Sequence, residues 1–424
     1  MTAHIYDAKN IKNPLNLQAN CIIFKNLGIA NHGNSLLDIN SAIIANNPNV
    51  AYSSLSLLFL YVTQVNNNPN IIIIPNERFI SLLENHPWFE VVAIAASPRS
   101  AGKTYEEAIG GRWKMTTPMP EAVKKIVVQD VSDVDSVASK VDFVFSAVDM
   151  TKDEIKKIEE EYAKTETPVV SNNSAHRWTP DVPMVVPELN PEHLEVIVDQ
   201  KKRLGTTRGF IVVKPNCSIQ SYTPALHALK KAGYEPKTVV ATTYQAISGA
   251  GKTFKDWPEM EHNIIPFIGG EEEKSEQEPL RIWGHVENGE IVKADSPVIT
   301  TQCIRVPVQD GHTAAVFMTF EEGKKPSKEE IIKVWREFSG MPQELGLPNA
   351  PKHFIQYIEE DNRPQVSLDV NYENGFGISL GRLREDTVFD YKFVGLSHNT
   401  VRGAAGGAVL IAELLKAKGY ITAK

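Results

Sequence analysis

The segment VDFVFSAVDMTKDEIKKIEEEYAKT, residues 141–165, decides the fold class of this chain. Its beginning, VDFVFSAV, is almost continuously apolar, which predicts a strand buried on both faces of a sheet. The residues that follow have helical periodicity, and Thr151 with Glu154 three positions later forms the pattern of a capping box. We therefore predict a buried strand followed directly by a helix.

Two more buried strands are predicted upstream, FEVVAIAAS at 89–97 and KKIVVQD at 124–130. A short helix is predicted before them in ERFISLLENHPWF, residues 77–89. Apolar strands that alternate with helices indicate a parallel sheet covered on both faces. The predicted fold is α/β, with a doubly wound, Rossmann-like nucleotide-binding domain.

The second half of the chain has longer strand patterns that alternate between apolar and polar residues. They are TVVATTYQAI at 238–247, SPVITTQCIRVPV at 296–308 and HTAAVFMTF at 312–320. Alternation of this kind predicts a mixed or antiparallel sheet and hence an α+β domain. The chain ends in a strand and a helix whose first turn is rich in Gly and Ala, at 402–408. Small residues permit close approach, so we expect this last helix to return to the first domain.

The overall composition excludes several classes of protein. The chain has 424 residues, 44 Lys and Arg, 52 Asp and Glu, and a net charge of -8. It offers no basic surface to phosphates, which argues against a nucleic-acid partner. Three cysteines exclude a disulfide scaffold and fit a reducing compartment, so we expect a cytoplasmic protein. No metal site is predicted.

The first 76 residues differ in composition from the rest, with 16 Asn, no Arg and only 5 charged side chains. They match neither an Arg-rich transit peptide nor a secretory signal. The uncharged stretch at 51–65 is shorter than the roughly 20 residues that a bilayer requires, so no membrane span is expected. We interpret residues 1–76 as an atypical leader, either disordered or mis-translated, and not as the native start of the domain.

Cys217 is the strongest candidate nucleophile. It lies at a predicted strand-to-helix junction in GFIVVKPNCSIQSYTPALHALKKAGY, where free backbone N–H groups and the helix dipole favour a thiolate. The same N–H groups can hold an oxyanion. The alternative is that Cys217 is a small buried residue, and the residue alone does not separate the two interpretations. Cys303, inside an alternating strand, is interpreted as a core residue.

Candidate partners for the thiol lie further along the chain. His312 follows a strand end and can act as the proton-transfer group, while Arg305 on the same segment can bind a carboxylate. Glu271 and Lys274 are three residues apart in EEEKSEQE and share one face if that segment is helical. The alternative for these two residues is a solvated charged face, which is the more common role of such a run.

A polar cluster after a predicted strand indicates the cofactor. SPRSAGK, residues 97–103, offers Ser97, Arg99, Ser100 and Lys103 to an anion. At the end of the second strand of a nucleotide-binding unit, Arg with serines suits a 2′-phosphate, whereas an acidic residue suits a free ribose. This pattern favours NADP over NAD.

Six strings taken together resemble the aspartate-semialdehyde dehydrogenase family, in the branch found in archaea, fungi and some bacteria. The resemblance extends from about Arg78 to the C-terminus, and the strings occur in the order expected for the family. They are SAHRWTPDVPMVVPELNPEHL (174–194), KPNCSIQ (214–220), TYQAISGAG (243–251), EEEK (271–274), RVPVQDGHTAAV (305–316) and LSHNTVRGAAGGAVL (396–410).

The resemblance implies a reductive dephosphorylation of 4-phospho-L-aspartate to L-aspartate 4-semialdehyde, in the biosynthesis of Lys, Thr, Met and Ile from aspartate. Cys217 would displace phosphate to form a thioester, and a hydride from NADPH would then reduce that thioester. The family's roles fall on positions of this sequence as follows: His312 as general acid/base, Asn216 and Gln245 orienting substrate and nucleophile, Arg177 and Lys274 on the phosphate, Glu271 on the amino group, and Arg305 on the α-carboxylate.

The resemblance also implies the cofactor contacts and the domain boundaries. Ser97, Arg99 and Ser100 would contact the 2′-phosphate, and the rest of the dinucleotide would lie along Ser146, Ser248, Gly249 and Asn399. We expect an NADP-binding domain at 77–215, completed by 396–424, and a catalytic and dimerisation domain at 216–395. The expected partners are a small-molecule substrate, phosphate, and further copies of the chain in a homodimer or homotetramer.

One feature departs from the family pattern. Where the family has a Gly-rich loop of the type G-A-T-G-x-V-G, this chain has NIIIIPN at 70–76. Ile71 to Ile74 can form a strand, but Pro75 and Asn76 leave no room for the loop, whose glycines allow the backbone to approach a pyrophosphate. The absence of this loop supports one alternative function, a non-catalytic homologue of the same fold. The resemblance implies a second alternative, a malonyl-CoA reductase, because relatives in the same branch reduce that thioester with the same Cys and His.

Overall fold

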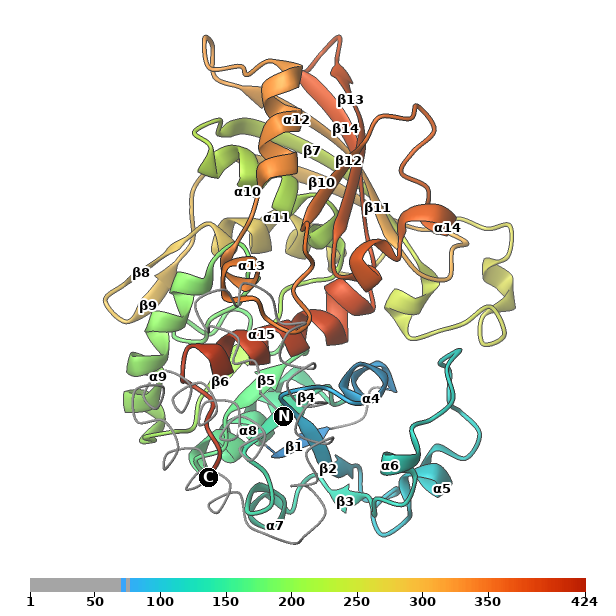
Figure 1. Cartoon of the computed structure of the whole chain (residues 1–424), viewed down its shortest axis with the longest axis vertical. Coiled ribbons are helices and arrows are strands. Elements are labelled where there is room, and N and C mark those ends of the chain that lie inside the picture. The colour runs from blue at the N-terminus through green and yellow to red at the C-terminus, as the bar shows by residue number, and fades with distance from the viewer. Residues whose placement is uncertain (1–69, 74–76) are drawn as a thin grey trace, which may run out of the picture. The chain divides into compact units, whose positions relative to one another are not determined.

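The computed structural model describes residues 70–73 and 77–424 (Figure 1). The interpretation of the leader falls on residues that lie outside this part of the chain, apart from 70–73. Those four residues form a strand, β1 (Asn70–Ile73), which agrees with the strand considered possible at Ile71–Ile74. The position expected to hold the phosphate-binding loop, 74–76, lies outside the described residues.

The first sheet has six parallel strands in the order β3-β2-β1-β4-β5-β6. Their bounds are β2 (Glu90–Ala96), β3 (Gln129–Asp130), β4 (Phe143–Ser146), β5 (Val169–Ser171) and β6 (Ile211–Val213). β1 lies in the middle, paired with β2 on one side and β4 on the other. This is the order of a doubly wound dinucleotide-binding sheet, so the predicted Rossmann-like fold is confirmed. The strand predicted at 124–130 is shorter than expected, because the backbone of Ile126 and Val128 bonds to residues 102–105 and not to β2.

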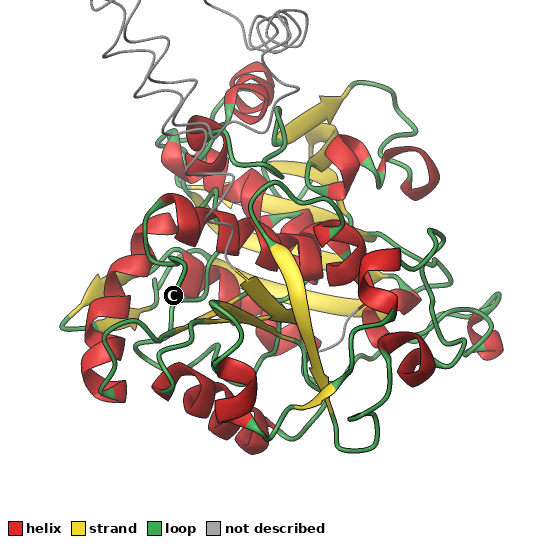
Figure 2. Ribbon diagram, turned by 60° about the horizontal axis from the view of Figure 1, so that its bottom comes forward, coloured by secondary structure: helices red, strands yellow, loops and turns green. Residues whose placement is uncertain are grey.

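Helices cover both faces of this sheet, as Figure 2 shows, because consecutive strand residues point to opposite sides. Ala93 and Ala95 pack with α7 (Val134–Ala138) and α8 (Lys152–Lys164). Ile94, between them, packs with α4 (Glu77–Leu83) and α15 (Gly406–Ala417) on the other face. The capping box predicted at the start of α8 is present, with Thr151 and Glu154 as its members. The last helix therefore returns to the first sheet, as expected.

The second sheet is mixed, with the order β10-β7-β11-β14-β13-β12. β10 (Val298–Arg305) runs parallel to β7 (Pro236–Gln245), and β11 (His312–Phe320) runs antiparallel to β7 and to β14 (Tyr391–Ser397). β13 (Ile378–Glu385) pairs antiparallel with β14 and parallel with β12 (Ile355–Ile358). α10 (Thr223–Lys231), α11 (Glu271–Ile282) and α12 (Lys328–Glu337) pack against strands of this sheet.

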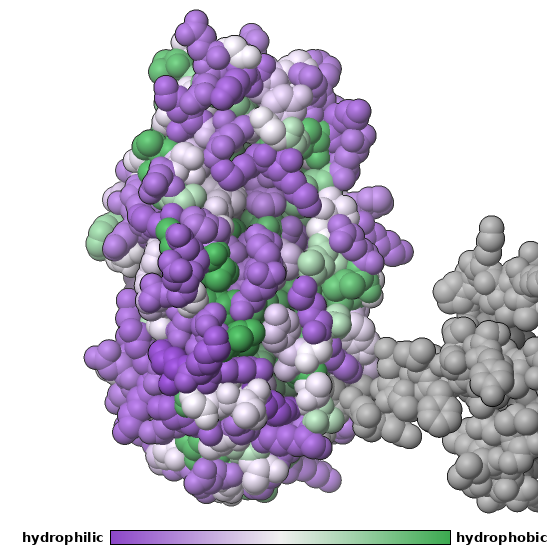
Figure 3. All heavy atoms as spheres, turned by 90° about the vertical axis from the view of Figure 1, so that its left-hand side faces the viewer, coloured by the Kyte–Doolittle hydropathy of each residue, from purple (hydrophilic) through white to green (hydrophobic). Residues whose placement is uncertain are grey.

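The remaining elements lie in the connections between the strands and helices described above. They are α5 (Tyr105–Ile109), α6 (Glu121–Lys124), η3 (Pro191–Val196), α9 (Ile197–Leu204), η4 (Ser218–Ser221), η5 (Ile247–Ala250), η6 (Pro258–Met260), β8 (His285–Glu287), β9 (Glu290–Val292), α13 (Met341–Leu345), α14 (Val366–Asp369), η7 (Tyr372–Gly375) and η8 (Val401–Ala405). The side that carries β8, β9 and α9 is mostly hydrophilic (Figure 3). Within 70–73 and 77–424, no helix has the length and apolar character needed to cross a membrane.

Close backbone packing joins the end of the first sheet to the second sheet. Gly395 in β14 lies directly on η4, so that a Cβ atom on this glycine would be 1.9 Å from the carbonyl oxygen of Ser221. Only glycine permits this distance between the two backbones. The segment that carries Cys217 is therefore held against the middle of the second sheet.

We predict that Gly395→Ala lowers the free energy of unfolding by about 2–3 kcal/mol, because the added methyl group forces η4 away from β14. Urea unfolding followed by circular dichroism measures this change. Gly269→Ala is the matched control, since its Cβ would have no heavy atom within 4 Å. Equal midpoints for the two variants would show that the contact at Gly395 does not constrain the fold.

Candidate active site

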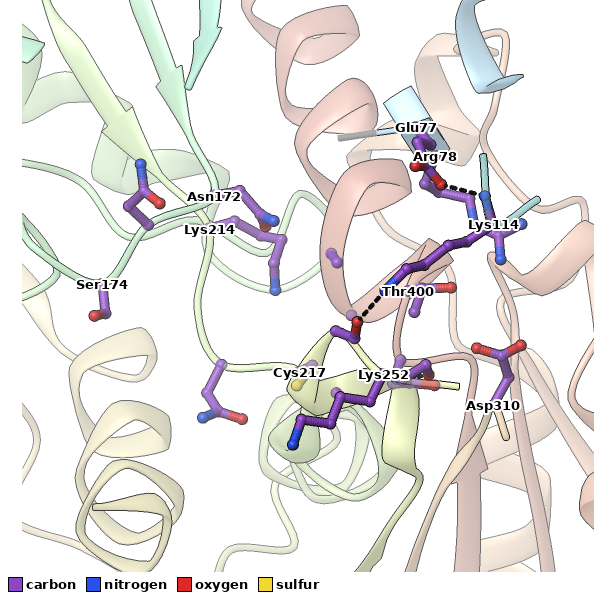
Figure 4. Close-up of a pocket in the computed structure, with 18 of the residues that line it drawn as sticks. Glu77, Arg78, Lys114, Asn172, Ser174, Lys214, Cys217, Lys252, Asp310 and Thr400 are labelled. Atoms are coloured by element: carbon purple, nitrogen blue, oxygen red, sulfur yellow. Dashed lines mark hydrogen bonds between the residues drawn. The ribbon is translucent and has the colours of Figure 1, made fainter. Parts of the chain in front are cut away.

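A cavity of about 530 Å³ lies where the carboxyl ends of the first sheet meet the second sheet (Figure 4). Its walls come from the start of α4, the loop after β5, the segment after β6, the loop after β7, the first turn of α11, and the segment before α15. In open parallel sheets, ligands bind outside the carboxyl ends of the strands, where the strand order reverses. Here that reversal lies between β1 and β4, so the cavity is the candidate site.

Cys217 opens into this cavity between β6 and η4 and is half-buried. The expected helix does not begin at Cys217. A four-residue 3₁₀ helix follows it, and α10 begins at Thr223, because Pro224 is suited to the first turn of a helix. Burial raises the pKa of the Cys217 thiol, and the Glu271 carboxylate raises it further. The positive charges of Lys214, Arg177 and Arg305 oppose this increase in the pKa.

His312, the first residue of β11, is fully buried and lies beside the thiol. Its Nε2 is 3.4 Å from the Sγ of Cys217, so the structure brings together the predicted nucleophile and its predicted partner. The other ring nitrogen, Nδ1, accepts a hydrogen bond of 3.1 Å from the backbone N–H of Ala246. Burial, with the nearby charge of Arg305, lowers the pKa of His312 to about 3. The ring is therefore neutral at neutral pH and carries its proton on Nε2.

Glu271, at the start of α11, is the centre of a hydrogen-bonded group. One carboxylate oxygen accepts from Lys274 Nζ at 2.8 Å, and the other accepts from Asn216 Nδ2 at 2.8 Å and Gln245 Nε2 at 3.4 Å. Burial alone would raise the pKa of Glu271, but these hydrogen bonds outweigh it and lower the pKa below its ordinary value. Glu271 is thus an anion, and four of the predicted site residues meet at this point.

The segment EEEKSEQE is helical, and only one of its faces is solvated. Glu272 and Glu273 are exposed, whereas Glu271 and Lys274 line the cavity. The interpretation of this segment as a solvated charged face therefore describes Glu272 and Glu273. Glu271 and Lys274 lie on the same face of the helix because they are three residues apart.

Arg305, at the end of β10, is buried behind Gly249, which lines the cavity. Its Nη1 donates a 2.7 Å hydrogen bond to the carbonyl oxygen of Ala246. A Cβ on Gly249 would lie 2.9 Å from Nη1 of Arg305 and 3.2 Å from the ring of His312. Gly249 therefore allows the loop after β7 to pack directly on these two side chains.

Arg177 lines the cavity. The contacts that hold its side chain there were not predicted from the sequence. Its Nε donates to the carbonyl oxygen of Lys214 at 3.0 Å, and its Nη1 pairs with the carboxylate of Glu278 at 3.0 Å. The second oxygen of Glu278 accepts the backbone N–H of Asn216 at 2.5 Å. Glu278 is fully buried, although its segment was interpreted as a charged face. The signal was present, because Glu278 lies four residues after Lys274 on the same helix face.

Lys214 is a second residue that sequence reasoning missed. It follows β6 directly, is 3% exposed, and lines the cavity together with Cys217. Its Nζ donates to the carbonyl oxygen of Pro215. Burial, with the nearby charge of Arg177, lowers the pKa of Lys214 to about 7. In the sequence, Lys214 is one more lysine beside a turn, and its spacing from other residues did not indicate that it belongs to the site.

The predicted cofactor residues fall into three groups. Ser248 and Asn399 line the cavity, where Nδ2 of Asn399 donates to Oγ of Ser248 at 2.8 Å. Ser146 lies at the end of β4, but its hydroxyl donates to the buried carboxylate of Glu159 at 2.6 Å and is fully buried. The third group lies in the loop after β2, where the side chains are exposed or half-buried: Ser97, Arg99 and Ser100.

The described residues contain no group of three or more His, Cys, Asp or Glu side chains that could hold a metal ion. The charged groups that face the cavity are instead Lys and Arg side chains and single carboxylates. Such a site suits an anionic substrate, and its reactive atom is the sulfur of Cys217.

Comparisons with known proteins place this chain among the semialdehyde dehydrogenases. The family model described as "Semialdehyde dehydrogenase, NAD binding domain" matches residues 76–197. The model described as "Semialdehyde dehydrogenase, dimerisation domain" matches residues 226–402. The first match covers β2 to β5 of the first sheet, and the second match covers all six strands of the second sheet.

Individual relatives extend this similarity over most of the chain. The aspartate-semialdehyde dehydrogenase of Aspergillus fumigatus is 41% identical over 357 residues, which are 82% of this chain and 95% of the relative. That of Methanothermobacter thermautotrophicus is 42% identical over 349 residues, 80% of this chain and 95% of the relative. The crystal structure of the Candida albicans enzyme with NADP is 38% identical, has a TM-score of 0.74, and matches over 83% of this chain and 99% of its own.

We predict that Glu278→Gln lowers the free energy of unfolding by about 2–4 kcal/mol, because it leaves the buried charge of Arg177 unpaired. Urea unfolding at neutral pH measures the change. Glu273→Gln is the matched control, since Glu273 is an exposed carboxylate on the same helix and its loss should change stability by less than about 0.5 kcal/mol. If both variants unfold at the same urea concentration, Glu278 does not hold the site together.

Proposed function

Because this chain belongs to the aspartate-semialdehyde dehydrogenase family, we propose that it catalyses the NADP-dependent reductive dephosphorylation of 4-phospho-L-aspartate to L-aspartate 4-semialdehyde. The observation that carries this proposal is the 3.4 Å contact between Sγ of Cys217 and Nε2 of His312, inside a cavity that is lined by Arg177, Glu271 and Lys274. The reaction is a step in the biosynthesis of Lys, Thr, Met and Ile from aspartate.

The shape of the cavity supports a dinucleotide cofactor. It extends from Cys217 to Glu77 and Arg78 at the start of α4, beside the point where the strand order of the first sheet reverses. Its lining includes a buried amide oxygen, Oδ1 of Asn172, that has no hydrogen-bond partner among the described residues. A polar group of a ligand would satisfy that oxygen. The residues present therefore fit a bound nucleotide.

We assign the cofactor contacts to two groups of residues. Ser248, Gly249 and Asn399 line the cavity and are in reach of the part of the dinucleotide that lies next to Cys217. The loop after β2 follows the strand beside β1, where the adenosine ribose of such cofactors lies, and would carry the 2′-phosphate contacts through Ser97, Arg99 and Ser100. NADP is the ligand in the Candida albicans structure. When bound, NADPH supplies the hydride that reduces the acyl group on Cys217.

The first chemical step in this proposal is displacement of phosphate by Cys217. Sγ forms a bond to the acyl carbon, the bond from that carbon to the phosphate oxygen breaks, and the electron pair leaves with the phosphate. Arg177 and Lys274 are the proposed phosphate ligands. Nη2 of Arg177 makes no hydrogen bond to the part of the chain that the structure describes, so the guanidinium can still bind an anion.

The remaining side chains bind and orient the substrate. Glu271 is an anion, as its lowered pKa requires, and is proposed to bind the amino group. Arg305 is proposed to bind the α-carboxylate, with Asn216 and Gln245 orienting the substrate beside the sulfur. His312 presents Nε2–H to the sulfur, and we propose it as the general acid/base of the reaction.

We propose that the chain forms a homodimer, or a homotetramer built from such dimers, through one face of the second sheet. On this face, side chains of the four neighbouring strands remain half-buried, whereas the residues between them are fully buried. Its apolar members are Val240, Ile304, Ala315, Phe317 and Val394. The family model that matches this region describes a dimerisation domain. A half-buried sheet face of this kind is typical of a subunit interface.

The proposed domain division follows the two sheets. The nucleotide-binding domain comprises 77–215 with 396–424, and β1 at 70–73 belongs to its sheet. The catalytic and dimerisation domain comprises 216–395. Because Cys217 follows the last strand of the first sheet, the nucleophile lies at the boundary between the two domains.

We predict that Cys217→Ser lowers turnover roughly a thousandfold or more, because no thioester can form. The assay follows NADPH formation from L-aspartate 4-semialdehyde, phosphate and NADP. Cys303→Ala is the matched control, because Cys303 is buried in the second sheet and its loss should leave turnover near the wild-type value. A wild-type protein that is inactive in this assay but oxidises NADPH with malonyl-CoA would overturn the proposed substrate.

We predict that Val240→Arg converts the dimer to monomers, because it introduces a charge into the centre of the proposed interface. Light scattering after size-exclusion chromatography measures the mass. Lys328→Glu, on α12, is the charge-changing control and should leave the mass unchanged. If Val240→Arg keeps the wild-type mass, the interface lies elsewhere.

A further inference from the structure

A single buried carboxyl group joins α8 to the carboxyl ends of β4 and β5. Glu159, on α8, is fully buried, and its Oε1 accepts hydrogen bonds from the hydroxyl groups of Ser146 at 2.6 Å and Ser171 at 2.7 Å. The two serines are the last residues of their strands and are direct partners in the pairing of β4 with β5. Nδ2 of Asn173 donates to the same oxygen at 3.1 Å. Three donors, from two strand ends and the loop after β5, thus converge on one atom.

Packing alone does not account for this cluster. The carboxyl group is removed from water, which raises the pKa of Glu159, and its three hydrogen bonds only partly offset that effect. Its second oxygen, Oε2, is buried without a hydrogen-bond partner among the described residues. Burying a polar group in this way is unfavourable, and an apolar side chain would fill the same space at lower cost. The role of Glu159 therefore lies in what it orients.

The side chain that Glu159 orients is that of Asn173. Both hydrogens on Nδ2 of Asn173 are used, in bonds to Oε1 of Glu159 at 3.1 Å and to Oγ of Ser146 at 3.0 Å. Its backbone N–H donates to Oγ of Ser171 at 3.1 Å. Turning the amide over would bring its oxygen against the oxygen of Glu159, so the orientation is fixed. Oδ1 of Asn173, a residue of the cavity wall, accepts no hydrogen bond from residues 70–73 and 77–424.

The loop after β5 carries two amide oxygens that the described part of the chain leaves without a donor. Residues 172–174 all line the cavity, and Figure 4 shows Asn172 and Ser174 on the same side of it as Lys214. Oδ1 of Asn172 is the second such oxygen, and the backbone N–H of Asn172 donates to the carbonyl oxygen of Ser146 at 2.8 Å. Oxygens of this kind require a donor from a ligand. A dinucleotide has donors in its ribose hydroxyl groups and in the carboxamide of nicotinamide, whereas its phosphates only accept.

The position of this loop indicates which half of the dinucleotide it faces. A doubly wound sheet binds one mononucleotide with each of its halves. The half that contains β2 is assigned to the adenosine side, through the loop after β2. β4, β5 and β6 form the other half, and the loop after β5 shares its cavity with Cys217, the residue whose acyl group receives the hydride. The nicotinamide half is therefore the part of the cofactor that lies beside Asn173.

We propose that Glu159 is a positioning residue for the cofactor: it holds the amide nitrogen of Asn173, so that the amide oxygen of Asn173 faces the nicotinamide half of NADP. Glu159 is not part of the cavity wall, and it acts through Asn173. Ser146, predicted as a direct cofactor contact, has its hydroxyl engaged by Glu159 and Asn173 and belongs to the same positioning group. The inference rests on the proposed function, which supplies the cofactor.

The experiment measures binding of the cofactor to the full-length protein in the absence of substrate. Isothermal titration calorimetry gives the dissociation constants of NADP and of 2′,5′-ADP, which carries the adenosine half and the 2′-phosphate but no nicotinamide. We expect Glu159→Ala to weaken NADP binding about tenfold, because the amide of Asn173 is no longer held in one orientation. The same variant should bind 2′,5′-ADP within about twofold of the wild type, because that ligand does not reach the loop after β5.

Two further variants separate positioning from a general structural role. Glu159→Gln should bind NADP within about threefold of the wild type, because its amide oxygen can accept the same hydrogen bonds. When Glu159→Ala is combined with Asn173→Ala, the NADP affinity should equal that of Asn173→Ala alone, since Glu159 has nothing left to orient. Glu161→Ala is the matched control, because Glu161 lies on the same helix with a side chain that is 44% exposed.

Circular dichroism verifies the fold of each variant, and Glu159→Met, which is close to Glu in volume, replaces Glu159→Ala if that variant does not fold. The inference alone would be overturned by an unchanged NADP affinity in the variant used, by an equal loss for NADP and 2′,5′-ADP, or by additive effects of the Glu159 and Asn173 substitutions. A wild-type protein that does not bind NADP would overturn the proposed cofactor, and this inference with it.

Discussion

The structure around the nucleophile depends on one buried carboxylate, that of Glu278. One of its oxygens pairs with Arg177, and the other accepts the backbone N–H of Asn216, the residue before Cys217. Arg177 in turn bonds the carbonyl of Lys214, so the segment from Lys214 to Cys217 is bound by both members of the ion pair. A buried ion pair is costly unless each of its atoms is hydrogen-bonded, and here the backbone of the catalytic segment supplies those bonds. The loop conformation and the ion pair thus require one another.

The charges of the site are balanced in pairs, and this balance determines which of them can take part in chemistry. Arg402 pairs with Glu188, and its Nε also bonds Gln220 in the turn after Cys217, so its charge holds backbone in place and is not free for a ligand. Lys214 has no carboxylate partner at hydrogen-bond distance among the described residues, and its Nζ donates to the carbonyl oxygen of Pro215. The ion pairs of Arg177 and Arg402 therefore hold the backbone on either side of Cys217 in place.

The sequence was sufficient to predict the fold and most of the side chains that meet at the cavity, for identifiable reasons. Apolar strands with intervening helices report burial on both sheet faces, a property of each local segment. Contacts between segments that are far apart in the sequence cannot be predicted from the residue pattern of either segment. The role of Glu278 depends on Arg177, 101 residues away, and the orientation of Ser146 depends on the buried carboxylate of Glu159. The residues around Lys214 did not predict its burial, because a buried lysine and an exposed lysine look the same in a sequence.

The register of the second sheet explains why the remaining catalytic side chains come together. Gln245 and Arg305 are direct partners at the ends of two parallel strands, so both side chains reach the same edge of the sheet. β11 runs in the opposite direction, and its pairing of Thr313 with Tyr244 brings its first residue, His312, to that same edge. A shift of one residue in either pairing would turn His312 or Arg305 to the other face of the sheet. The geometry of the site is therefore a consequence of strand pairing over the whole length of β7. Close backbone contacts such as that of Gly395 with η4 maintain this pairing geometry, and they therefore affect the site although they lie away from it.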